Sequence, residues 1–199
     1  MRVVVLSDTH EKHRELSPLP DADLVVHTGD FATIGTEVEV LDFLNWFCDL
    51  PHRHKVFVCG NHDEPLLSGS VSGLPNNCHQ LNFSSVVIEG IKIAGFPFFI
   101  ELEGVSEYQK AMEYEEEGVD IMVSHQPPFS ILDKDPLYGH LGSPTLLMKV
   151  KTWQPKFHLF GHIHEASGRL HEEGTTFINA AQMQNEVAIP LRPPIVIDL

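Results

Sequence analysis

The stretch Arg2-Val-Val-Val-Leu-Ser-Asp-Thr-His10 runs from a β-branched apolar segment straight into an aspartate and a histidine. Further apolar runs end in the same way: Leu24-Val-Val-His-Thr-Gly-Asp30, Val56-Phe-Val-Cys-Gly-Asn-His-Asp63, Ile121-Met-Val-Ser-His125 and His158-Leu-Phe-Gly-His-Ile-His164. Apolar runs of this length predict buried strands. Because ligand sites in α/β sheets assemble at the carboxyl ends of strands, we expect these endings to converge on one site.

Helix signals between the strands predict an α/β fold. Helix starts are marked by Thr36-x-x-Glu39, Ser106-x-x-Gln109 and Ser143-Pro144. The first helix is expected over 38–48, with Leu41 and Leu44 facing inward, and the second is expected to close at Gly118. Strands are expected over residues 2–6, 23–27, 55–59, 85–89, 91–94, 121–124, 157–160, 175–179 and 194–198, with a hairpin turn between Ile88 and Ile91.

Composition limits the classes of function. The 199 residues have a formal net charge of −15, which argues against extended nucleic-acid binding. We find no apolar run long enough to cross a bilayer and no signal peptide at the start, so the expectation is a single domain over 1–199, cytoplasmic and without membrane contact. Three cysteines without a CxxC pair argue against a disulfide framework. The oligomeric state is left open.

The polar residues after the strands are donors that divalent metals accept. Aspartate, histidine and asparagine suit borderline and hard cations, and side chains two residues apart can reach one ion where a strand unwinds. Glycines at or just before the ligands permit tight backbone there. The set is too large for one zinc ion, which usually takes four ligands, and it suits two ions about 3.5–4 Å apart. The candidate ligands are Asp8, His10, Asp30, Asn61, His125, His162 and His164.

In this order, the motifs Asp-x-His, Gly-Asp, Gly-Asn-His-Asp, Ser-His and Gly-His-x-His resemble those of the calcineurin-like metallophosphoesterase superfamily. Further stretches resemble its small metallophosphoesterase-domain-containing branch, which is similar to class III cyclic nucleotide phosphodiesterases: Gly29-Asp-Phe31, Ser124-His-Gln-Pro-Pro128, His140-Leu-Gly-Ser-Pro-Thr-Leu-Leu147, Gly161-His-Ile-His-Glu165 and Ile178-Asn-Ala180. The resemblance implies a four-layer αββα sandwich, in which two mixed sheets lie face to face with helices outside.

The resemblance also implies roles for the candidates. One metal would be held by Asp8, His10, Asp30 and His164, and the other by Asp30, Asn61, His125 and His162, so that Asp30 bridges. His62 is similar to the family's histidine that contacts phosphate and donates a proton to the leaving oxygen. The native metal is not indicated, because such a site accepts manganese, iron or zinc.

One departure from the family bears on the substrate and on His62. Protein phosphatases of the superfamily carry Gly-Asp-x-x-Asp-Arg-Gly, whereas this chain has Gly29-Asp-Phe-Ala-Thr-Ile-Gly35. Thr33 replaces the acid that would orient the catalytic histidine, and Ile34 replaces a phosphate-binding arginine. A protein phosphatase is therefore not expected. The group that orients His62 is either Asp63, which we include among the catalytic candidates, or a backbone carbonyl.

These observations predict a phosphoesterase with two divalent cations. The cations would lower the pKa of a bridging water, and the resulting hydroxide would attack phosphorus in line, with His62 as the general acid. The expected substrates are small phosphodiesters such as cyclic nucleotides. The alternatives are a phosphomonoesterase or a nuclease of the same fold and, from another class, a non-catalytic metal-binding scaffold.

Aromatic residues near the expected site loops could stack on a nucleobase. Packing within the loops is at least as good an explanation for each. The residues concerned are Phe31, Phe98, Phe99 and Tyr138. Among the histidines outside the candidate set, we expect His27 and His158 to be structural and His13 and His52 to lie at the surface.

Overall fold

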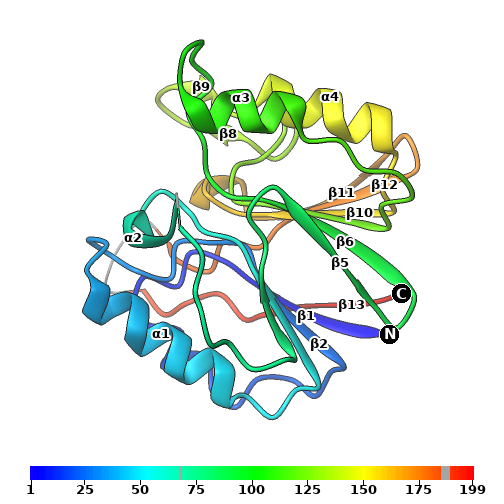
Figure 1. Cartoon of the computed structure of the whole chain (residues 1–199). Helices are drawn as coiled ribbons and strands as arrows, with labels where there is room; N and C mark the ends of the chain where they lie inside the picture. The colour runs from blue at the N-terminus through cyan, green and yellow to red at the C-terminus, as the bar shows by residue number, and fades with distance from the viewer. Residues whose placement is uncertain (68, 185–188) are drawn as a thin grey trace.

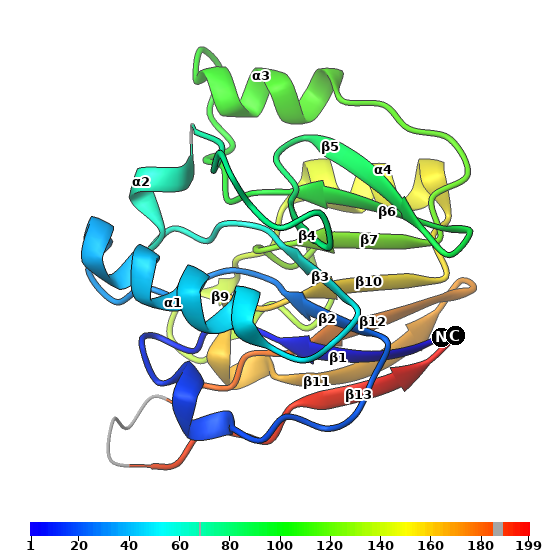
Figure 2. The same ribbon diagram turned by 60° about the horizontal axis from the view of Figure 1, so that its bottom comes forward.

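The computed structural model describes residues 1–67, 69–184 and 189–199. Two mixed β-sheets lie face to face, with helix α1 (Glu37–Asp49) outside the first sheet and helices α3 (Ser106–Glu113) and α4 (Pro144–Trp153) outside the second (Figures 1 and 2). A short helix, α2 (Glu64–Leu67), follows the third strand. This confirms the expected αββα sandwich.

The first sheet has the strand order β13-β1-β2-β3-β4, in which only β13 runs antiparallel to its neighbour. Its strands are β1 (Arg2–Leu6), β2 (Leu24–His27), β3 (His54–Phe57), β4 (Cys78–Gln80) and β13 (Ile195–Asp198). Because β1, β2 and β3 are parallel, the loops that follow them meet at one edge of the sheet.

The second sheet has the order β11-β12-β10-β7-β6-β5, with the parallel strands β12, β10, β7 and β6 at its centre. Its strands are β5 (Ser84–Ile88), β6 (Ile91–Phe96), β7 (Ile121–Ser124), β10 (Phe157–Phe160), β11 (Gly168–Glu172) and β12 (Thr175–Asn179). Two further strands, β8 (Lys134–Asp135) and β9 (Gly139–His140), form a small hairpin, and single 3-10 turns lie at η1 (His13–Leu16) and η2 (His164–Ala166).

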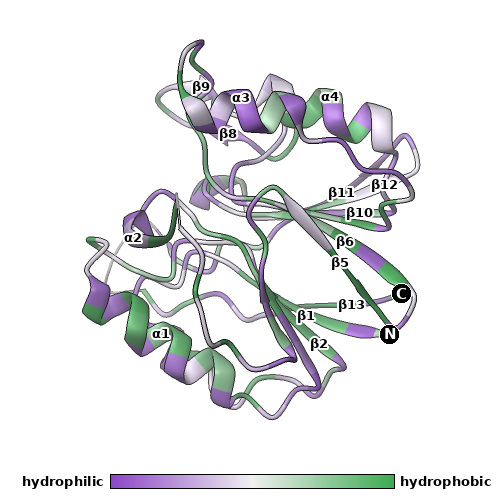
Figure 3. Cartoon of the chain, viewed as in Figure 1, coloured by the Kyte–Doolittle hydropathy of each residue, from purple (hydrophilic) through white to green (hydrophobic). Residues whose placement is uncertain are grey.

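Side-chain alternation along the strands divides the core into layers. On β1, Val3 and Val5 are buried between the two sheets, while Val4 and Leu6 pack beneath α1. A third cluster fills the space between the second sheet and helices α3 and α4. Helix α1 alternates between hydrophobic and hydrophilic residues, as expected of a helix with one face on a sheet (Figure 3).

Several local predictions are wrong, each for a physical reason. Leu41 is 58% exposed, because the buried stripe of α1 runs through Val40, Phe43, Leu44 and Phe47. In the second helix the N-cap residue is Val105, and the helix ends after Glu113, well before Gly118.

The short strands β4, β8, β9 and β11 were not predicted; β11 lies mostly exposed at a sheet edge and lacks an apolar run. His13 and His52 are buried rather than at the surface. The cap at Thr36, the cap at Ser143 and the hairpin that joins Ile88 to Ile91 are confirmed.

No helix in the described residues combines the length and apolar character that a bilayer crossing requires.

Two strand histidines are fully buried, each beside a hydroxyl group. Nε2 of His27 lies 3.1 Å from Thr9 Oγ1, and Nε2 of His158 lies 2.8 Å from Ser124 Oγ. Burial lowers the pKa of each imidazole to about 3. Both histidines therefore stay neutral in the folded protein at pH values where the unfolded chain protonates them.

We predict that this difference makes the protein less stable as pH falls from about 6.5 towards 3, since the unfolded chain then binds more protons than the folded one. Each buried histidine contributes a slope of about 1.4 kcal/mol per pH unit. In His158→Gln, which keeps a partner for Ser124, the dependence of unfolding free energy on pH between 6 and 4 should be shallower by about that amount. Urea unfolding of the metal-free protein at several pH values measures it.

His171→Gln, at an exposed position of β11, is the matched control and should keep the wild-type slope. An unchanged slope in His158→Gln would contradict the prediction.

Candidate metal centre

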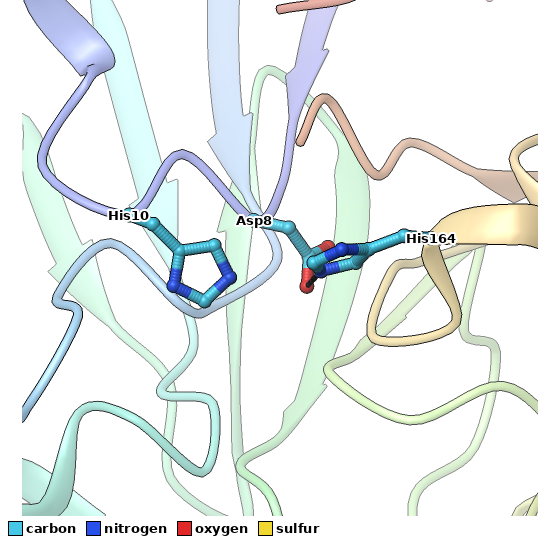
Figure 4. A group of neighbouring side chains, drawn as sticks. All are labelled: Asp8, His10 and His164. Carbon is cyan, nitrogen blue, oxygen red and sulfur yellow. Dashed lines mark hydrogen bonds and ion pairs between the residues drawn. The ribbon is translucent and has the colours of Figure 1, made fainter. Parts of the chain in front are cut away.

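The loops that follow β1, β2, β3, β7 and β10 meet at one edge of the sandwich and bring all of the predicted ligands together. Nε2 of His164 lies 3.2 Å from Asp8 Oδ1, and Nε2 of His10 lies 3.9 Å from Asp30 Oδ2. Asp8, His10 and His164 form one group whose donor atoms lie within 4.8 Å of one another. In Figure 4, the His164 ring lies against the Asp8 carboxylate, with His10 beside them.

A second group of donors adjoins the first through Asp30. Nε2 of His125 lies 3.3 Å from Asp30 Oδ2, 3.1 Å from Asn61 Oδ1 and 3.1 Å from His162 Nδ1. Asp30, His125 and His162 also place donor atoms within 4.8 Å of one another. Asp30 stands between the groups, because its carboxylate faces both His10 and His125. A third group, made of His10, Asp30 and His62, also has its donor atoms within 4.8 Å of one another, so Asp30 is common to two groups. Donor groups that meet at one carboxylate fit a pair of divalent cations.

Backbone carbonyls fix the orientation of three histidine rings. His10 Nδ1 donates to the carbonyl of Ala32 at 3.0 Å, and His125 Nδ1 donates to that of Thr28 at 3.0 Å. Both rings then present Nε2 to the site. A hydrogen bond from the other ring nitrogen to a carbonyl fixes the tautomer in this way in metal-binding histidines. His62 Nδ1 donates to the carbonyl of Thr33 at 2.6 Å. A backbone carbonyl, and not Asp63, therefore orients the His62 ring.

Asp63 has contacts other than those expected of the group that orients His62. Its fully buried carboxylate accepts hydrogen bonds from the N–H groups of Asp30 (2.8 Å), Phe31 (3.1 Å), Ala32 (3.0 Å) and Gly60 (2.8 Å). The side chain thus ties the loop after β2 to the loop after β3. Asp63 is a positioning residue for the neighbouring loops. The alternative in which Asp63 orients His62 is therefore wrong.

Glu39 completes the hydrogen bonding of the loop that carries Asp30. Its Oε2 accepts from the N–H groups of Thr33, Ile34 and Gly35 at 2.7, 3.0 and 3.2 Å. The capping-box motif marked Glu39 as the partner of a helix start, and nothing in it indicated this second contact. Because Thr33 belongs to the segment that Glu39 holds, Glu39 also positions the carbonyl that orients His62.

The backbone at the site adopts conformations that side chains rarely take. Asp8, His10, Asp30 and His162 have φ values of 52°, 40°, 56° and 71°, in the left-handed region. Glycine is needed where the loops touch: a Cβ at Gly161 would overlap the side chains of Ser7 and Asp8, and one at Gly60 would overlap the Asp30 carboxylate. The sharp local bends turn the donors inward from the strand ends.

The electrostatics of the site follow from buried carboxylates beside imidazoles. Burial opposes ionisation of Asp8, but the hydrogen bond from His164 and the charge of His125 lower its pKa overall. Burial likewise lowers the pKa of His125, but the Asp30 carboxylate outweighs this and raises it to about 9. Burial and the charged His125 lower the pKa of His162 to about 4. The protonated His125 imidazole therefore offsets carboxylate charge, a role that a bound cation would take over.

His62 and five of the candidate ligands, His10, Asp30, Asn61, His162 and His164, line a cleft of about 570 Å³, together with residues that were not site candidates from the sequence. These further lining residues are Lys12, Thr33, Glu165, Met183 and Gln184. Glu165 directly follows the candidate ligand His164 in the sequence and Lys12 lies two residues after His10, a signal that could have suggested them. Met183 and Gln184 follow β12, outside every recognised motif, and reach the site only through the fold.

The sequence is similar to that of known proteins. A family model described as calcineurin-like phosphoesterase matches residues 1–166. The chain is 32% identical to metallophosphoesterase domain-containing protein 1 of Homo sapiens, with 100% of this chain and 71% of that protein covered. It is also 32% identical to a UPF0046 protein of Caenorhabditis elegans, with 97% of this chain and 73% of that protein covered.

Solved structures share the fold at low sequence identity. TT1561 of Thermus thermophilus gives a TM-score of 0.64 at 13% identity, with 91% of this chain and 90% of that chain covered. An archaeal phosphodiesterase gives a TM-score of 0.51 at 17% identity, with 90% of this chain and 82% of that chain covered.

We predict that Asp63→Asn destabilises the protein and loosens the donor set. The amide group cannot accept from all of the N–H groups that the carboxylate holds, and each buried donor left without a partner costs about 1–3 kcal/mol. The free energy of unfolding should fall by about 3 kcal/mol or more, measured by urea unfolding, and bound manganese should fall with it, measured by elemental analysis.

Asp135→Asn is the matched control, because Asp135 accepts two backbone N–H groups in the exposed β8–β9 hairpin. If Asp63→Asn were as stable as this control, the four hydrogen bonds would not be what holds the loops.

Proposed function

Because this chain belongs to the calcineurin-like phosphoesterase family, we propose that it is a phosphodiesterase that uses two divalent cations to hydrolyse small phosphodiesters, cyclic nucleotides among them. The observation that carries the proposal is the position of Asp30. Its Oδ2 lies 3.9 Å from His10 Nε2 and 3.3 Å from His125 Nε2, within reach of both donor groups, as a ligand shared by two cations must be. The open cleft beside it suits small or accessible esters.

The proposed ligands divide between the two cations. Asp8, His10, Asp30 and His164 hold one, and the other is held by Asp30, Asn61, His125 and His162. When bound, the cations supply a water that is acidic enough to act near neutral pH, and they draw charge from the phosphate oxygens. They also reverse the local sign of a chain whose net charge is −15, so that an anionic substrate can enter.

His62 is the proposed general acid. It lines the cleft, its ring centroid lies 4.9 Å from that of His10, and its Nδ1 is bound to the Thr33 carbonyl. The remaining nitrogen, Nε2, can hold a proton for the leaving oxygen. No contact with Asp63 is required for this role, since the carbonyl alone sets the ring.

The cation-dependent activity is testable directly. Protein reconstituted with manganese, zinc or iron should hydrolyse bis(p-nitrophenyl) phosphate, and removal of the metal with a chelator should abolish turnover. Parallel assays with p-nitrophenyl phosphate, cyclic nucleotides and single-stranded DNA separate a diesterase from a monoesterase or a nuclease. Failure of every reconstituted form to cleave any of these esters would favour a non-catalytic scaffold instead.

We predict that two variants separate metal binding from proton transfer. Asp30→Ala removes the shared ligand and should lose both metal and activity. His62→Ala should keep the metal content of the wild type but lower kcat about a hundredfold or more, the usual contribution of a general acid. Elemental analysis and steady-state kinetics measure the two effects, with His171→Ala as a control outside the cleft. Loss of metal in His62→Ala would show that the role assigned to His62 is wrong.

A further inference from the structure

One wall of the cleft is built by the segment that follows β12, here called the rim segment (residues 181–184). A parallel bridge joins Ser7 to Ala181, the Gln182 N–H donates to the Ser7 carbonyl at 3.1 Å, and the Met183 N–H donates to the Asp8 carbonyl at 3.1 Å. The rim segment is thus attached to the backbone of a proposed metal ligand. Met183 cannot shift without disturbing Asp8.

Side chains brace the rim segment from both sides. The buried Gln182 accepts from the Ser7 N–H through Oε1 at 3.2 Å. Arg192 donates through Nη1 to the carbonyls of Ala181 at 3.2 Å and Met183 at 2.8 Å. Since these contacts lie on the backbone and on Gln182, they leave the side chains of Met183 and Gln184 to line the cleft.

Met183 differs chemically from the rest of the lining, because it is the one wholly apolar side chain among the described residues that border the cleft. Its thioether is polarisable and conforms well to flat rings. The aromatic residues considered from the sequence do not border the cleft. Phe31 and Phe99 are core residues with exposures of 0% and 2%, and Phe98 packs against the rings of His125 and His162.

The position of Met183 relative to His62 indicates which part of a substrate it meets. His62 follows β3, whereas the rim segment is bridged to the end of β1, and β2 lies between these strands. In the proposed reaction the leaving oxygen must lie at His62. With that end of the cleft taken by the leaving group, the β1 side, where Met183 and Gln184 lie, is left for the substituent that remains on phosphorus.

We propose that Met183 is a specificity-determining residue that contacts the planar base of a nucleoside esterified to the phosphate, with the amide of Gln184 beside the polar edge of that base. Gln184 is oriented by the bond from its Nε2 to the Pro190 carbonyl at 2.9 Å. This inference rests on the proposed phosphodiesterase activity and names its substrate class as diesters that retain a nucleoside on phosphorus.

The test uses two diesters with the same leaving group. Thymidine 5′-(p-nitrophenyl phosphate) carries a nucleoside on phosphorus, and methyl p-nitrophenyl phosphate carries only a methyl group. Manganese-loaded wild type should favour the thymidine ester, and Met183→Ala should reduce that preference in kcat/KM about tenfold, mainly through KM, as expected for the loss of an apolar contact. Met183→Leu, which restores apolar volume, should recover most of the preference.

Met148→Ala is the matched control, because Met148 is an exposed methionine on α4 outside the second sheet. Equal losses on both esters, or an unchanged preference, would overturn the role of Met183 while leaving the diesterase activity intact.

If the wild type cleaves neither ester, the proposed function fails, and a binding measurement then decides the inference. Thymidine 5′-monophosphate should bind the manganese-loaded protein more tightly than inorganic phosphate, with the advantage lost in Met183→Ala; equal binding would overturn the inference.

Discussion

The carboxylate of Asp63 is the interaction on which the arrangement of the site depends. It holds N–H groups of two loops that come from different strands, and in doing so it sets Asp30 against Asn61. Glu39 holds the continuation of the same loop through three further N–H groups. Every backbone N–H from Asp30 to Gly35 is thereby held, so a loop rather than a strand can carry the proposed shared ligand with little freedom.

A second constraint acts between the sheets. Asp30 follows a strand of the first sheet and His125 a strand of the second, yet their side chains lie 3.3 Å apart. The layer between the sheets is filled by fully buried residues such as Val5, Val26 and Val123, and burial of each such side chain is worth about 1.5–3 kcal/mol. The apolar layer fixes how the sheets pack on each other. The distance between donor atoms from the two sheets therefore depends on this packing.

The donor set was predictable from sequence because each donor follows an apolar run, and strand ends gather at a sheet edge. What orients His62 was not, since the Thr33 carbonyl is a backbone group that any residue type would supply. Asp63 was one of the two groups expected to orient His62, because side-chain identity does not distinguish a carboxylate that contacts an imidazole from one that accepts backbone N–H groups. The position of Met183 could not be predicted, because pairing of the rim segment with Ser7 and Asp8 sets it, and such pairing between distant segments leaves no local pattern.

The left-handed backbone of Asp8, His10, Asp30 and His162 has a consequence for the history of the fold. Such conformations are unfavourable for residues with a side chain, and glycine relieves them at no steric cost. While cations are bound, selection must keep carboxylate and imidazole at these four places despite that strain. A related protein that bound a protein partner instead of metal would not need carboxylate or imidazole at these positions. Glycine at these four positions is thus the mark by which such a lineage would be recognised.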